Sequence, residues 1–75
     1  MEGGVLMPLA LAKTGEIQTI RKISGRDDTK RFLESLGFVI GGQVTVVSEI
    51  NGNMIVNVKE SRVAISKAMA ARIMV

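Results

Sequence analysis

The side chains that most often perform catalysis are missing from this sequence. Among its 75 residues there is no His and no Cys, so the usual general base near neutral pH and the thiolate nucleophile are both absent. The remaining pair with the right chemistry is Ser66-Lys67, because a lysine can activate a serine. A serine that begins a short helical turn is better explained as a helix cap. We therefore expect that the protein is not an enzyme.

The adjacent carboxylates of Asp27 and Asp28 are the best candidate ligands for a hard cation. A calcium site takes about six to eight oxygen ligands, and no further carboxylates lie near this pair in the sequence. The start of a helix explains both residues, with Asp27 as the N-cap and Asp28 in the first turn. Of the five methionines, Met54 and Met69 are typical core fillers. We predict no cofactor; a transient ferrous ion is possible, but the ligand residues do not support one.

The charge pattern does not favour a nucleic-acid interface. The ten Lys and Arg are scattered, and with seven Asp and Glu they leave a net charge of +3. The two aromatic residues, Phe32 and Phe38, are expected in a helix stripe and its cap, where neither could stack on a base. We therefore expect no nucleic-acid partner. No apolar run approaches the ~20 residues of a membrane span, and the lack of Cys fits a reducing compartment such as the cytoplasm.

The elements that carry these residues are expected to be mostly short strands. The hydrophobic residues, 47% of the chain, are mainly branched aliphatics, which favour strands. Gly3-Gly4 indicates a flexible leader over residues 1–6, so that one domain spans residues 7–75. Within it, the alternation from Pro8 to Leu11 predicts a short edge strand. Residues 16–23 predict a strand with a bulge or face switch at its middle.

A short helix is predicted from Asp28 to Leu36. Its apolar stripe consists of Phe32, Leu33 and Leu36. Gly37 is expected to end the helix in a left-handed conformation, with Phe38 contacting Leu33 as in a Schellman cap.

The second half of the chain predicts a β-hairpin and a final strand. After a turn at Gly41, residues 43–50 alternate, which places Val44, Val46 and Ile50 on one face. Asn51-Gly52 is the strongest hairpin signal, and the return strand spans residues 54–59. A turn at Glu60-Ser61, a strand over residues 62–66, a helical turn over 67–71 and a strand over 73–75 complete a small barrel that is mainly β.

The order of these elements resembles the ferrous iron transport protein A family. The residues that match its signature are Leu36, Gly37, Phe38, Gly41, Val44 and Val46. The opening and the ending also look similar, at Leu9, Gly15, Ile20, Ala64, Ile65, Ala71, Ile73 and Val75. Ile40 departs from the pattern, because many members carry proline there. The resemblance covers the chain from about Pro8 onward. The same small domain also occurs at the end of iron-dependent repressors.

This resemblance implies an SH3-like barrel, with one short helix after the early strands and a helical turn before the last strand. It also implies a cytoplasmic, non-enzymatic accessory protein that binds the cytoplasmic part of a membrane-embedded GTPase that imports ferrous iron. The alternatives are a small-barrel nucleic-acid-binding protein and a metal-responsive regulatory domain. The matched positions are structural, as are Asp27 and Leu33, so no binding site carries over. Exposure suggests Asn51, Gly52 and Ile55 as partner contacts.

Overall fold

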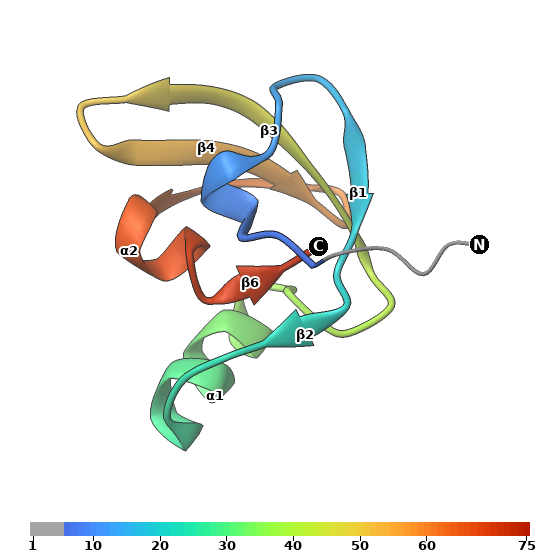
Figure 1. The fold of residues 1–75 in the computed structure, drawn as a ribbon, viewed down its shortest axis with the longest axis vertical. Helices are drawn as coiled ribbons and strands as arrows, with labels where there is room; N and C mark the ends of the chain where they lie inside the picture. Colours follow the sequence, from blue (N-terminus) through green and yellow to red (C-terminus); the bar gives the residue numbers. More distant parts are fainter. Residues whose placement is uncertain (1–5) are drawn as a thin grey trace.

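The computed structural model describes residues 6–75 and shows a mainly β fold with two antiparallel sheets (Figure 1). The four-stranded sheet has the order β1-β3-β4-β5, with β1 at Ile17–Thr19, β3 at Gln43–Ile50, β4 at Asn53–Val58 and β5 at Ser61–Ser66. The second sheet pairs β2, Lys22–Ile23, with β6, Ile73–Met74. The helices are η1, a 3-10 turn at Leu9–Leu11, α1 at Asp27–Ser35, and α2 at Lys67–Ala70. The predicted fold class is confirmed. The predicted leader lies almost wholly outside the described residues.

The prediction of a strand from Pro8 to Leu11 is wrong, because this segment forms η1. The amide of Leu11 donates to the carbonyl of Pro8 and that of Ala12 to Leu9, each at 2.9 Å. Proline has a φ that suits the start of such a turn and lacks an N–H for a ladder. Leu9 is fully buried while Leu11 is 71% exposed. The segment therefore contributes one buried side chain to the core instead of a strand face.

The predicted strand over residues 16–23 is divided between the two sheets. β1 pairs with β3, β2 pairs with β6, and Ile20 lies fully buried between them. The Ile20 amide donates to Gly42 at 2.8 Å, and the Gly41 amide donates to Ile20 at 2.7 Å. The turn at Gly41 thus anchors the crossing point. The face switch that the isoleucine spacing predicts is a change of sheet, not a bulge in one strand.

The start of α1 corrects the predicted helix cap. Arg26 occupies the N-cap position, without a side-chain hydrogen bond, so Asp27 is not the cap. Asp27 and Asp28 both lie in the first turn, where their charges interact favourably with the helix dipole. The Asp28 carboxylate accepts a hydrogen bond from the Thr29 amide at 2.8 Å.

The end of α1 confirms the predicted Schellman cap. Gly37 has a φ of +107°, the Phe38 amide donates to Leu33 at 3.0 Å, and the Gly37 amide donates to Glu34 at 2.9 Å. Leu33 and Phe38 are fully buried, while Leu36 is partly buried against the core. Phe32 is half-exposed, so the prediction that it belongs to the same buried stripe is wrong.

The β3–β4 hairpin forms around Asn51-Gly52 as predicted. Both residues have positive φ, +49° and +80°, as a type I′ turn requires. Val44 and Val46 point into the core, but the register shifts between Val46 and Ser48. This bulge reverses the faces beyond it. Ile50 is therefore 55% exposed, and its predicted inward position is wrong.

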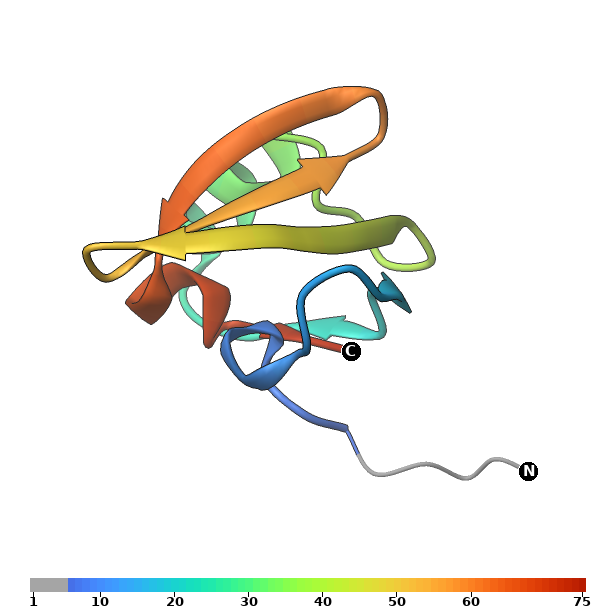
Figure 2. The same cartoon turned by 90° about the horizontal axis from the view of Figure 1, so that it is seen from above.

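The last third of the chain closes the domain over a single core. The turn between β4 and β5 falls at Lys59-Glu60, one residue earlier than predicted, and Ser66 caps α2. Seen from above, η1, β2 and β6 lie across one side of the four-stranded sheet (Figure 2). Backbone hydrogen bonds join Met7 and Val75 in both directions. The buried core comprises Leu9, Ile20, Ile23, Leu33, Phe38, Val44, Val46, Met54, Val56, Val58, Ile65, Ala70, Ile73 and Val75.

Candidate interaction surface

The candidate serine–lysine pair has a structural role. The Ser66 hydroxyl accepts a hydrogen bond from the Met69 amide at 3.2 Å, which caps the N-terminus of α2. The Lys67 ammonium group forms an ion pair with Glu49 at 2.5 Å. The Lys67 side chain therefore engages Glu49, and the Ser66 hydroxyl engages the helix backbone. The helix cap is therefore the interpretation that the structure supports.

The acidic pair at the start of α1 is not assembled with further ligands. Asp27 and Asp28 are both exposed, and the Asp28 carboxylate is engaged by the Thr29 amide. Within residues 6–75, no group of three or more acidic side chains is arranged to hold a metal ion. The methionine prediction is confirmed for the core, with Met54 buried and Met69 packed against the buried cluster.

The tip of the β3–β4 hairpin is exposed and is held by a backbone hydrogen bond from α2. Asn51 and Gly52 are both exposed, and the Gly52 carbonyl accepts a hydrogen bond from the Lys67 amide at 3.0 Å. Ile55, predicted as an exposed contact, is half-buried, whereas Ile50 presents its apolar side chain to solvent. The bulge in β3 explains the exposure of Ile50. Partner binding by Asn51 and Gly52 stays a prediction.

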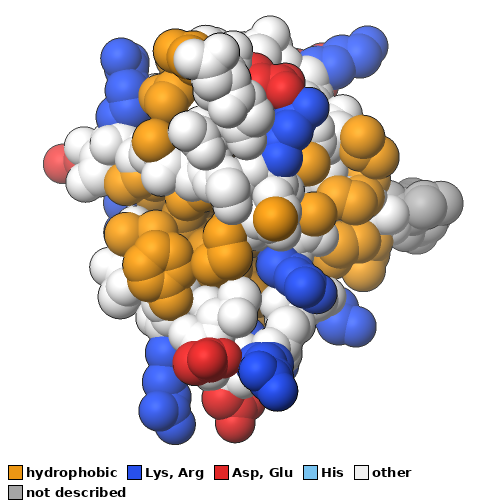
Figure 3. Space-filling view, turned by 90° about the vertical axis from the view of Figure 1, so that its left-hand side faces the viewer, with side chains coloured by type: hydrophobic (Ala, Val, Ile, Leu, Met, Phe, Trp, Pro, Cys, Tyr) orange, Lys and Arg blue, Asp and Glu red, His pale blue; other side chains and the backbone are white. Residues whose placement is uncertain are grey.

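Several large apolar side chains reach the surface, and Phe32 on α1 is the one aromatic residue among them. The exposed set comprises Leu6, Leu11, Ile17, Phe32, Ile40 and Ile50. Apolar side chains gather between α1, at the bottom of the view, and the elements above it (Figure 3). The sequence does not predict the exposure of Phe32, because Phe32 and Leu33 are adjacent apolar residues and only Leu33 is buried. The assumption that both aromatics serve the core is wrong for Phe32.

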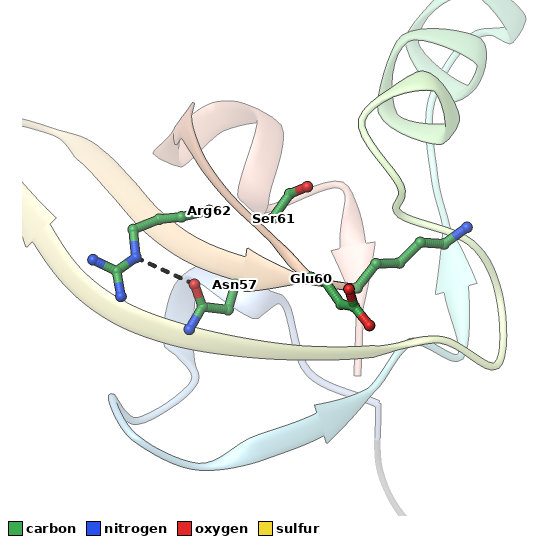
Figure 4. A pocket seen from close by; sticks show the side chains of 5 residues that line it. Asn57, Glu60, Ser61 and Arg62 are labelled. Carbon is green, nitrogen blue, oxygen red and sulfur yellow. Dashed lines mark hydrogen bonds between the residues drawn. The ribbon is translucent and has the colours of Figure 1, made fainter.

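An open polar hollow of about 500 Å³ lies at the turn between β4 and β5 (Figure 4). Its lining residues are Asn57, Lys59, Glu60, Ser61 and Arg62. The Arg62 guanidinium donates to the side-chain oxygen of Asn57 at 3.3 Å. A shallow site in which a carboxylate neighbours two cations offers a small ligand little enclosure. The hollow is better suited to forming part of a larger contact surface.

The fold and this surface together define a class of protein: a small SH3-like module that presents exposed apolar side chains and turns on a rigid β scaffold. A family model, the FeoA domain, matches residues 7–75. The chain therefore belongs to the FeoA domain family, as the sequence pattern predicts.

Individual relatives agree with this assignment. The chain is 37% identical over 70 residues to "Putative Fe(2+) transport protein A" of Methanocaldococcus jannaschii, covering 93% of this chain and 85% of that protein. A crystal structure of an iron uptake regulatory protein (FeoA) superposes with a TM-score of 0.84 at 30% identity, over 93% of both chains. The zinc complex of Stenotrophomonas maltophilia FeoA, described as an SH3 domain protein, gives 0.68 at 25% identity, over 89% of this chain and 86% of that one.

The same fold also occurs inside a larger protein. A manganese-dependent transcriptional repressor superposes with a TM-score of 0.84 at 22% identity. The match covers 93% of this chain and 40% of that repressor. At this identity the likeness concerns the fold alone.

Proposed function

We propose that this protein is a non-enzymatic accessory protein of ferrous iron uptake. It acts in the cytoplasm by binding the cytoplasmic part of a membrane-embedded GTPase that transports ferrous iron. The observation that carries the proposal is the FeoA domain match over residues 7–75, supported by the 37% identity to an Fe(2+) transport protein A. Between residues 6 and 75, no helix is both long enough and apolar enough to span a bilayer.

The surface chemistry supports binding to a partner more than binding to a small ligand. The apolar side chains at the surface stand on rigid elements, among them the β3–β4 hairpin and α1, which suits a protein–protein contact. The described residues bring no three acidic groups together around a cation. The zinc in the Stenotrophomonas structure is a property of that protein. Regulation through metal binding to this chain is therefore the weaker alternative.

The test is direct binding of the full chain to the isolated GTPase domain of the ferrous iron transporter from the same organism. We expect saturable binding in isothermal titration calorimetry, with an affinity in the micromolar range that a transient regulatory contact requires. Titration of the same folded protein with ferrous ion alone, under anaerobic conditions, serves as the comparison. No heat of binding to the GTPase domain at micromolar concentrations would contradict the proposal, and saturable ferrous binding would favour the metal-responsive alternative.

A further inference from the structure

The outer edge of β5 is open within the described part of the chain. β5 is the last strand of the four-stranded sheet, and residues 6–75 provide no strand on its other side. The Lys67 amide, which continues the ladder past the end of β5, donates to Gly52 of the hairpin. Backbone groups alternate in direction along an antiparallel strand. Arg62 and Ala64 therefore direct both their N–H and C=O groups outward, and Ser66 directs only its N–H outward, because its C=O accepts the first hydrogen bond of α2.

Each end of helix α1 lies close to one end of the segment that contains β5 and α2. Beyond its C-terminal end, a Cβ on Gly37 would lie 3.6 Å from the Val58 and Lys59 side chains, at the end of β4 and in the turn that leads into β5. Before its N-terminal end, the Ser24 amide donates to Arg72, just after α2, at 2.7 Å. The C-terminal end of the helix therefore lies beside the turn that leads into β5, and its N-terminal end lies beside the segment that follows α2. We call the surface made by the outer edge of β5 with Phe32, Leu36 and Val63 the α1–β5 face.

Apolar groups accompany the open backbone edge on this face. Phe32 and Leu36 are four residues apart and share one side of α1. Phe32 is 50% exposed, while Leu36 and Val63 are partly buried against the core. An unpaired strand edge beside apolar side chains is the arrangement that accepts an extended peptide as an additional strand.

The segments that contain α1, β5 and α2 carry the net positive charge of the protein. Residues 26–37 and 59–72 carry seven Lys and Arg and four Asp and Glu, whereas the rest of the chain carries three of each. All seven of these cationic side chains are exposed. The excess positive charge favours an acidic partner. It also disfavours a second copy of this chain, because two such faces would repel each other.

From these observations we propose that an extended, acidic segment of a partner protein binds to the α1–β5 face. It pairs with Arg62 and Ala64 through its backbone and packs apolar side chains against Phe32 and Leu36. This inference deepens the proposed function, because it states which chemistry the transporter's cytoplasmic part would offer. It also assigns the contact to residues other than Asn51 and Gly52 of the hairpin tip.

The test uses a fluorescein-labelled peptide as long as β5 in which Val and Glu alternate, titrated against the full chain by fluorescence anisotropy. The same peptide with N-methylated backbone amides is the first control, since it cannot donate hydrogen bonds to a strand edge. We expect the normal peptide to bind, more weakly at high salt, and the N-methylated peptide not to bind. This pair of ligands tests the edge without altering the protein.

Four variants locate the contact on the protein. Phe32→Ala should weaken peptide binding by about tenfold, as for a central apolar contact. Ile50→Ala, at the hairpin tip, is the matched control, because Ile50 is 55% exposed, and it should leave binding unchanged. Ala64→Pro removes an outward N–H, which an edge strand tolerates, and should abolish binding, while Ala64→Val should retain it.

Several results would overturn the inference. These are equal binding of the N-methylated peptide, no effect of Phe32→Ala, self-association that Ala64→Pro abolishes, and preference for an oligothymidylate over the peptide. The proposed function and the proposed α1–β5 face can be refuted independently of each other. If the GTPase domain binds wild type and Phe32→Ala equally, the α1–β5 face is wrong and the function stands. If the peptide binds as expected but the GTPase domain does not, the face stands and the proposed partner is wrong.

Discussion

Replacing Gly37 with alanine tests the conformation that ends α1. The φ of Gly37 is +107°, which L-residues rarely adopt. A Cβ at this position would lie 3.6 Å from its nearest neighbours, the side chains of Lys59 and Val58, so it would meet no steric clash. The cost therefore comes from the backbone and should be about 1–2 kcal/mol. Part of it is offset by roughly 0.4–1 kcal/mol, because alanine restricts the unfolded chain.

The expected change is measurable by thermal unfolding. In a domain of this size, 1 kcal/mol corresponds to a Tm shift of about 4–8 °C. We expect Gly37→Ala to lower the Tm by about 3–10 °C, monitored by circular dichroism. Gly37→Val should lower it further, because a β-branched side chain is less tolerated in this conformation.

Gly37→Asn is the matched comparison for this prediction. Asparagine enters the left-handed region more readily than alanine, so its Tm should lie between those of wild type and Gly37→Ala. A Tm for Gly37→Ala within about 1 °C of wild type would refute the argument from backbone conformation. Equal losses for Asn and Ala would instead show that the added side chain, and not φ, determines the cost.

Other substitutions separate core, surface and capping contributions. Phe38→Ala should cost about 3–5 kcal/mol because Phe38 is fully buried, while Phe32→Ala should change the free energy of unfolding by less than about 1 kcal/mol, as measured by urea denaturation. An equal loss for both would contradict the exposure of Phe32. Ser66→Ala should cost about 0.5–2 kcal/mol through loss of the α2 cap, and Ser66→Asp, which can still cap, should retain most of the stability. Glu49→Gln should cost no more than about 1 kcal/mol, since the ion pair with Lys67 is half-exposed, and a loss that persists unchanged in high salt would argue against an ionic origin. Ferrous ion should leave the Tm unchanged under anaerobic conditions, because the described residues assemble no group of acidic side chains around a cation. Binding of the ion to the native state would instead raise the Tm.

The local features of this fold follow from neighbouring residues in the chain. Gly37 followed by Phe38 predicts the Schellman cap, Asn51-Gly52 predicts the type I′ hairpin, and Ser66 predicts the cap of α2. In each case the relevant hydrogen bonds join residues within five positions of one another, so the sequence pattern contains the information. The family signature lies largely in the same local features, which is why the resemblance could be stated before the structure.

The candidate surface depends on contacts between segments far apart in the sequence. The bulge in β3 turns Ile50 outward, and the pairing of β2 with β6 divides the predicted strand over residues 16–23. Phe32 is exposed because α1 packs Leu33, and not Phe32, against the core. The apolar spacing along one helix does not show which of two adjacent apolar residues is buried. The open edge of β5 exists because no described strand pairs with it. Local sequence thus determined the caps and turns, and long-range packing determined which apolar groups and strand edges remain available to a partner.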